Sequence, residues 1–229
     1  MLPKVETPTF ETTVASTGEA VKFRPFLVKE EKILMLASES EEFKDMISAC
    51  SQIVQNCTFD KVKGSDLTMF DMQDLFLRIR EASVGESQEF NLVCGNCEKT
   101  TKYDLKLSDL KVKGLEDIPS GEIKVGDDFI VKMKFPSAVD VAFDGEQTDI
   151  DTVAKCIESI VTEDEETKPS DVSPEDLAEF IDDLPIDAMN EMRNFIRSMP
   201  VVEHSIDYDC PHCGEKQFIS INGYEHFFA

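Results

Sequence analysis

The chain switches between segments with a two-residue hydrophobic period, typical of strands, and segments with a 3.6-residue period, typical of helices. Residues 9–14 and 20–26 alternate on either side of a turn at 16–19, which predicts a β-hairpin. A helical stretch follows this hairpin. From residue 43 a single apolar face then predicts a helix; its members are Phe43, Met46, Ile47, Cys50, Ile53, Val54 and Cys57.

Helix-start signals and further periodic segments continue this pattern. Thr68 and Asp71 form a capping box that opens a second helix. Ser173, followed by Pro174 and acidic residues, predicts another helix start, and a further helix is expected over 188–199. Between these segments we expect a hairpin over 122–125 and 129–135, a helix over 150–161 and a mobile acidic loop over 162–171.

Two Cys-x-x-Cys pairs carry the clearest chemistry. They are Cys94-Gly95-Asn96-Cys97, here called the first knuckle, and Cys210-Pro211-His212-Cys213, the second knuckle. A two-residue spacer lets both sulfurs of a pair face one metal ion, and each pair lies between strand-like runs. This arrangement predicts a zinc ribbon, in which Gly95 and Gly214 provide the conformational freedom of the turns. One structural Zn²⁺ is expected on four ligands, Cys94, Cys97, Cys210 and Cys213.

Other interpretations of these cysteines remain open. An iron–sulfur centre would use the same four thiolates. His212 could replace one cysteine as a ligand. A thioredoxin-like motif would need one pair at the start of a helix, and disulfides would need an oxidising compartment that nothing else in the sequence indicates. Four protein ligands would leave no open coordination position, so the expected metal is structural.

The two knuckles are far apart in sequence, which predicts a split ribbon. The fold class is α+β: an N-terminal hairpin with helices, and a four-cysteine zinc ribbon interrupted by a large, mainly helical insertion. The corresponding domains are residues 1–87 for the hairpin and helices, 88–107 with 203–229 for the ribbon and C-terminal tail, and 108–202 for the insertion.

The charge balance restricts the possible partners. The chain has 47 acidic and 23 basic residues and a net charge of −24, so phosphate backbones would repel it and direct nucleic-acid binding is not expected. No apolar run approaches the roughly 20 residues that span a bilayer, and the pattern of the first residues leads us to expect no signal peptide. We therefore expect a cytosolic protein with reduced thiols.

Few other residues suggest a site. Cys50, Cys57 and Cys156 lie on or beside apolar helix faces and are expected in the core. The three histidines accompany no nucleophile motif, and no phosphate-binding glycine loop is present, so an enzyme is not expected. The aromatic C-terminal residues either pack on the core or anchor a partner, and the candidates for partner binding are Tyr224, Phe227 and Phe228.

Read in order, several segments resemble one family. They are the opening Met1-Leu2-Pro3-Lys4 with Pro8, residues 23–32 (FRPFLVKEEK), the first knuckle, and the C-terminal part from CPHCG to Phe227-Phe228. The chain resembles the baseplate hub assembly proteins of T-even-type contractile-tailed phages. This resemblance covers nearly the whole chain, and its specificity comes from the combination, because CPHCG alone occurs in many zinc ribbons.

The resemblance implies a non-enzymatic, late morphogenesis protein that acts in the cytoplasm of the infected bacterium. Such a protein would bind hub subunits in a chaperone-like way and promote assembly of the central hub of the tail baseplate. One alternative is a permanent structural component of the baseplate hub in the virion. Another is a zinc-ribbon module of the transcription or translation machinery that binds protein or imitates nucleic acid through its acidity.

Overall fold

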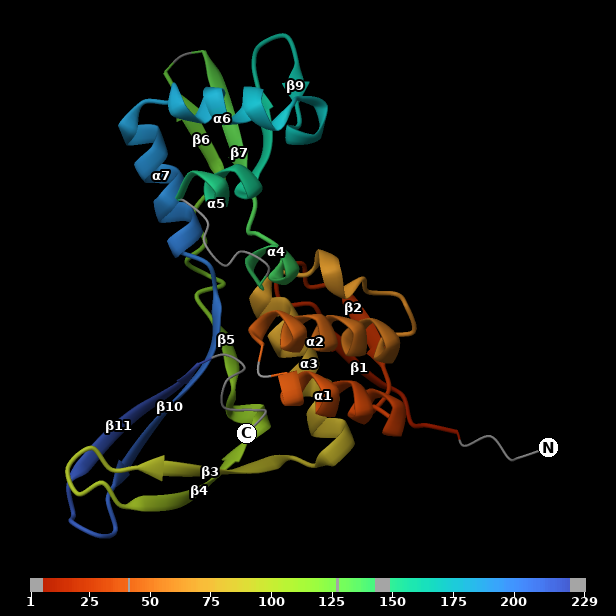
Figure 1. Cartoon of the computed structure of the whole chain (residues 1–229), viewed down its shortest axis with the longest axis vertical. Coiled ribbons are helices and arrows are strands. Elements are labelled where there is room, and N and C mark those ends of the chain that lie inside the picture. Colours follow the sequence, from red (N-terminus) through yellow and green to blue (C-terminus); the bar gives the residue numbers. More distant parts are fainter. Residues whose placement is uncertain (1–5, 41, 127, 143–148, 223–229) are drawn as a thin grey trace. The chain divides into compact units, whose positions relative to one another are not determined.

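The structure is a computed structural model that describes residues 6–40, 42–126, 128–142 and 149–222. The chain forms two compact units (Figure 1), Met1–Lys113 together with Val201–Ala229, and Gly114–Pro200. Both units contain helices and strands, which confirms the α+β class. The three-part division expected from the sequence is not tested by these two units and stays a prediction. Among the helices of the described ranges, none has the length and apolar character that a membrane crossing requires.

The first unit combines an N-terminal hairpin, three long helices and two further sheets. α2 (Phe43–Cys57) packs against both α1 (Val28–Ser40) and α3 (Met69–Val84). Most of its predicted apolar face is buried, with Ile47, Ile53 and Val54 fully inaccessible, but Phe43 at its start is 47% exposed. In chain order, the hairpin and the helices of this unit are β1 (Phe10–Thr13), β2 (Ala20–Phe23), α1 (Val28–Ser40), α2 (Phe43–Cys57), the 3₁₀ turn η1 (Gly64–Asp66) and α3 (Met69–Val84).

α3 begins where the sequence predicts. Thr68 is its N-cap, and the Thr68 hydroxyl accepts a hydrogen bond of 3.3 Å from the Asp71 amide. The same hydroxyl donates to one oxygen of the buried Asp71 carboxylate at 2.7 Å, and the other oxygen accepts a bond of 2.8 Å from the Ser16 amide. Since Ser16 lies in the turn between β1 and β2, the capping residues also fasten the N-terminal hairpin to α3.

A buried ion pair joins the end of β2 to α1 and α2. The Arg24 guanidinium donates to both oxygens of Glu30, at 3.0 and 3.3 Å, and the two residues are 7% and 0% exposed. The Arg24 amide also donates to the carbonyl of Cys57 at the end of α2. Burial alone would raise the pKa of Glu30, but hydrogen bonds from Arg24 and the Leu27 amide and the charges of Arg24 and Lys29 lower that pKa below its usual value.

The knuckles lie on two antiparallel hairpins of the first unit. β3 pairs with β4, while β10 pairs with β11 and, along its other edge, with the three-residue strand β5. β5 was not predicted, because three residues are too short to show a period. These elements are β3 (Ser87–Val93), β4 (Thr100–Lys106), the 3₁₀ turn η2 (Leu107–Asp109), β5 (Lys111–Lys113), β10 (Val201–Asp209) and β11 (Lys216–Asn222).

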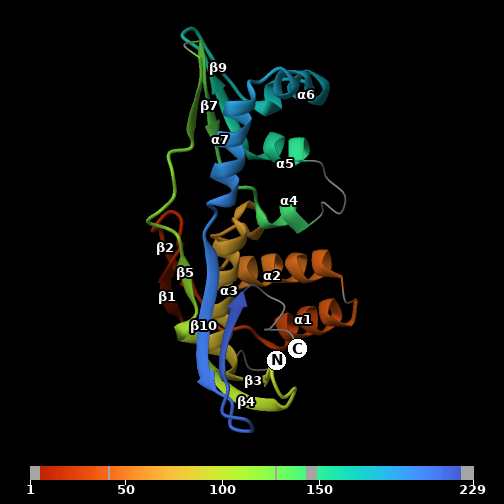
Figure 2. The ribbon, with the colours of Figure 1, turned by 90° about the vertical axis from the view of Figure 1, so that its left-hand side faces the viewer.

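The second unit is a four-stranded antiparallel sheet in the order β6-β7-β8-β9, with helices packed on one face (Figure 2). Its core joins Val131 and Met133 of the sheet to Ile181, Met192 and Phe195 of the helices. The elements are β6 (Glu122–Val125), β7 (Phe129–Met133), α4 (Ala138–Ala142), α5 (Asp149–Cys156), β8 (Ile157–Val161), β9 (Glu166–Thr167), the 3₁₀ turn η3 (Pro169–Asp171), α6 (Pro174–Asp182) and α7 (Ile186–Arg197).

Two sequence predictions in this unit were wrong. Residues 150–161 are not one helix, because α5 ends at Cys156 and β8 follows directly. β8 is rich in β-branched residues and pairs with β7 on one side and β9 on the other, and this pairing outweighs the local helical period. Residues 162–171 are not simply a loop, since they include β9 and η3. The insertion therefore contains a sheet larger than the one predicted hairpin.

Candidate metal centre

The two knuckles have the same backbone construction. In the first, the Cys94 amide donates to the Lys99 carbonyl at 3.0 Å and the Glu98 amide donates to the Cys94 carbonyl at 2.9 Å. In the second, the corresponding bonds are Cys210 to Glu215 at 2.9 Å and Gly214 to Cys210 at 2.8 Å. Each turn thus closes directly after a strand and points both of its cysteines in the same direction.

In each knuckle, the residue four positions after the first cysteine has a left-handed backbone. Gly214 has φ = 75° there, and Glu98 has φ = 59° in the first knuckle. The predicted role of Gly214 is therefore confirmed. The prediction for Gly95 was wrong, since the residue with positive φ in the first knuckle is Glu98. A side chain in this conformation costs about 1–2 kcal/mol that glycine avoids, so the first knuckle is the more strained of the two.

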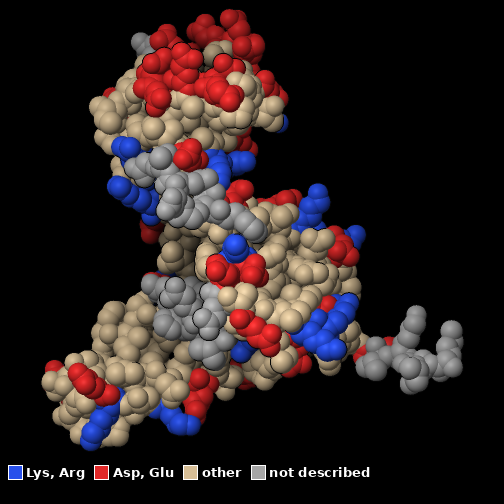
Figure 3. Space-filling model, in the orientation of Figure 1, with Lys and Arg blue, Asp and Glu red and all other residues tan. Residues whose placement is uncertain are grey.

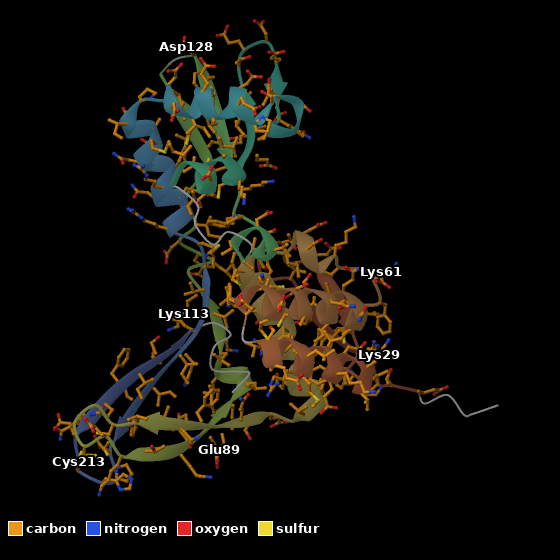
Figure 4. The ribbon with its side chains drawn as sticks, in the orientation of Figure 1. Lys29, Lys61, Glu89, Lys113, Asp128 and Cys213 are labelled. Atoms are coloured by element: carbon orange, nitrogen blue, oxygen red, sulfur yellow. The ribbon has the colours of Figure 1, made fainter. Side chains whose placement is uncertain are left out.

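The structure brings the four cysteines together. Their sulfurs all lie within 4.8 Å of one another, although residues 98–209 separate the two pairs in sequence. The Cys94 and Cys213 sulfurs are 3.7 Å apart, and the Cys97 and Cys210 sulfurs are 3.8 Å apart. Metal–sulfur bonds of about 2.3 Å in a tetrahedron require sulfurs about 3.8 Å apart. The four sulfurs therefore fit one tetrahedral ion, and Figure 4 shows Cys213 at the tip of its hairpin.

Three contacts hold the knuckles against each other without the metal. The Gly95 backbone amide donates to the side-chain oxygen of Gln217 on β11 at 2.9 Å. The side-chain nitrogen of Asn96 donates to the Cys213 sulfur at 3.8 Å. A ring nitrogen of His212 lies 3.3 Å from the Thr100 carbonyl on β4. His212 therefore contacts the opposite hairpin and lies outside the group of four sulfurs.

The surroundings of the sulfurs affect their protonation. Hydrogen bonds from the backbone amides of Cys97 and Asn96 lower the pKa of Cys94 to about 7. For Cys97, the amide of Lys99 lowers the pKa, but burial and the neighbouring sulfurs outweigh it and raise the pKa to about 11. Because metal ligands must be thiolates, a metal ion that filled this site would release protons, and the affinity of the site for that ion would fall as the pH decreases.

The remaining cysteines are core residues, as predicted. Cys50, Cys57 and Cys156 are fully buried, and burial raises the pKa of Cys57 and of Cys156 to about 11. They lie outside the group of four clustered sulfurs and take no part in the candidate metal site. Of the other candidates, His204 lies on β10, whereas His226 and the three aromatic residues Tyr224, Phe227 and Phe228 lie outside the described residues.

A bound ion with four protein ligands would have a complete tetrahedral shell. It could join the two hairpins but would offer no position for a water molecule or substrate. The partners that the sequence did not identify, Gln217, Asn96 and Thr100, show no periodic or motif signal. Their contacts exist only because the tips of the two hairpins meet in the folded chain.

Removing the metal from the zinc-loaded protein should loosen the knuckles before it affects α2. Without the ion, the knuckles are linked by the three contacts named above and by weak thiol–thiol contacts, whereas α2 is held by fully buried apolar side chains. After chelation we expect protease cleavage near residues 94–99 and 210–215 before cleavage within residues 43–57. Mass spectrometry of timed digests measures this order, and equal cleavage rates in both regions would show that the metal does not act as a local clasp.

The comparisons with known proteins identify the family of the chain. The profile of the family described as "T4 bacteriophage base plate protein" matches residues 7–229, which is almost the entire chain. No curated protein and no solved structure matched the chain. The match confirms the resemblance to a T4-type phage baseplate protein that the sequence indicated. The chain belongs to the T4 bacteriophage base plate protein family.

Proposed function

We propose that this chain is a non-enzymatic morphogenesis protein that binds hub subunits and promotes assembly of the central hub of the phage tail baseplate. The observation that carries the proposal is the family match over residues 7–229, because a baseplate protein works in association with other baseplate proteins. Its place of action is the cytoplasm of the infected bacterium, where tails are assembled. The family description equally supports a second candidate, a permanent component of the baseplate hub.

The proposed metal is one structural Zn²⁺ held by the four knuckle cysteines. Four thiolates at tetrahedral spacing are typical of structural zinc sites, and iron bound by the same sulfurs is the alternative that metal analysis distinguishes. A closed shell stabilises a fold and does not activate water. The metal therefore supports a binding role rather than a catalytic one.

The second unit carries the proposed steering surface. Acidic side chains gather over α6 and the β8–β9 connection (Figure 3). This acidic surface consists of exposed residues with one sign of charge: Glu163, Asp164, Glu165, Glu175, Asp176, Glu179, Asp182 and Asp183. A surface of this kind attracts a basic partner and raises the rate of association, while affinity comes mainly from apolar anchors. The proposed anchors are Tyr224, Phe227 and Phe228.

A hub subunit that awaits assembly exposes surfaces that are later buried, and such surfaces aggregate. We therefore expect co-expression with this chain to raise the soluble yield of its hub partner. Deleting residues 224–229 should reduce that gain by removing the anchors. Removing three charges of the acidic surface with Glu163→Gln, Asp164→Asn and Glu165→Gln should instead slow association and weaken the salt dependence of the association rate.

The matched control is the full-length chain with alanine at Tyr224, Phe227 and Phe228. It should lose the same gain as the deletion while keeping its metal content and its circular dichroism spectrum. If every hub subunit is equally soluble with and without this chain, the proposed assembly role is wrong. If the deletion reduces the yield but the alanine variant does not, the aromatic residues are not the anchors.

A further inference from the structure

The first helix has apolar residues on two opposite faces. One face of α1 is buried against the rest of the first unit through Glu30, Leu34 and Ala37. The opposite face presents Val28, Met35 and Leu36, which are 65%, 59% and 68% exposed. Scattered exposed apolar residues are ordinary on a protein surface, but three on one face of one helix form a stripe. Here we call it the α1 stripe.

Two charged residues lie on the same face as the stripe. Positions 28, 32, 35, 36 and 39 share one side of an α-helix, so Lys32 and Glu39 stand one helical turn before and after the central pair Met35 and Leu36. Both charged residues are exposed, and within the described part of the chain neither side chain forms an ion pair or a hydrogen bond. This differs from Lys29, labelled at the start of α1 in Figure 4, which lies 3.4 Å from the Glu30 carboxylate.

The order of these residues is self-complementary. When two copies of α1 are placed antiparallel about a point between residues 35 and 36, Met35 of each copy meets Leu36 of the other. The same placement sets Lys32 of each copy opposite Glu39 of the other. A two-fold axis requires this reciprocity, in which residue i contacts j and j contacts i.

We propose that the α1 stripe is a self-association surface and that its occupant is a second copy of this chain, packed antiparallel. The Met35 and Leu36 contacts form its apolar centre, and two Lys32–Glu39 pairs set its register. A helix of 13 residues is about 20 Å long, so this face alone buries less than the roughly 1,200–2,000 Å² of a stable interface. The dimer is therefore weak and exchanges with the monomer.

Charge reversal tests the proposed pairing directly. Sedimentation velocity of the full, zinc-loaded chain over a concentration series should show a monomer–dimer equilibrium. Lys32→Glu alone, or Glu39→Lys alone, should weaken dimerisation on the order of ten-fold, because each puts two like-charged pairs into the interface. The double variant Lys32→Glu/Glu39→Lys should restore it. A mixture of the two single variants should also dimerise, since each supplies the charge that the other needs.

The matched control is Lys61→Glu, which makes the same charge change on the exposed residue labelled in Figure 4 in the segment after α2. It should leave the dimerisation constant unchanged. Leu36→Glu should abolish the dimer, and its circular dichroism spectrum should remain that of the parent chain because Leu36 is exposed. A chain that is monomeric at all concentrations overturns the proposal. A dimerisation constant that Leu36→Glu leaves unchanged also overturns it. The proposal is equally wrong if the single variants weaken dimerisation but neither the double variant nor the mixture restores it.

Discussion

Cys210→Ser should abolish stoichiometric zinc binding. Cys210 is nearly fully buried directly after β10, and its sulfur lies 3.8 Å from that of Cys97. A serine hydroxyl at this position offers neither the negative charge nor the soft sulfur that zinc prefers. Structural zinc sites contribute about 10–16 kcal/mol of apparent binding energy in small zinc-finger peptides, so the loss should be among the largest caused by a single substitution.

Elemental analysis of the purified protein measures this effect. The parent chain should contain about one zinc per molecule, and the Cys210→Ser variant should contain much less than a stoichiometric amount after dialysis. Cys156→Ala is the matched control, because Cys156 is a buried cysteine of the second unit with no role in the metal site. Full zinc occupancy in Cys210→Ser, or equal loss in Cys156→Ala, would contradict the assignment of ligands.

Glu30→Gln should destabilise the first unit by about 3–5 kcal/mol, because it leaves the buried Arg24 guanidinium without a compensating charge. The loss is a large part of the 5–15 kcal/mol by which domains of this kind are usually stable. Urea unfolding measures it. Glu31→Gln, on the exposed side of α1, is the matched control and should change stability by less than about 0.5 kcal/mol. Equal effects of the two substitutions would show that the pair contributes little.

The pH dependence of stability gives an independent test of the same pair. The pKa of Glu30 is lowered in the folded state, so its contribution is fully present above the ordinary value of 4.5 and is lost as the pH falls below it. The parent chain should therefore lose more stability than Glu30→Gln when the pH is lowered through this range. Parallel pH profiles for the two proteins would show that the Glu30 carboxylate is not linked to folding.

Local signals predicted the parts of the fold that depend on neighbouring residues. Thr68 caps α3 and Ser173 caps α6, as expected, because a cap involves residues only three positions apart. The spacing within each knuckle likewise depends on a few adjacent residues, so the sequence identified all four cysteines that cluster. The pairing of two distant knuckles was a correct inference because neither pair alone completes a tetrahedral site.

Non-local contacts account for what the sequence did not show. β8 has a pattern that fits a continuing helix, and only its pairing with β7 and β9 makes it a strand. Gln217 contacts the first knuckle because two hairpins far apart in sequence lie tip to tip. The exposure of Met35 and Leu36 also depends on how the helices pack. Since α1 has apolar residues all around, its sequence alone does not indicate which face is covered.

The most direct test of the proposed baseplate role is to identify the proteins that cross-link to this chain in infected cells during tail assembly. Affinity purification with quantitative mass spectrometry should recover baseplate hub subunits at a higher level with the parent chain than with the chain lacking residues 224–229. Recovery from finished virions as well would favour the permanent hub component over an assembly factor that leaves. Recovery of RNA polymerase or ribosomes without any baseplate protein would contradict the account.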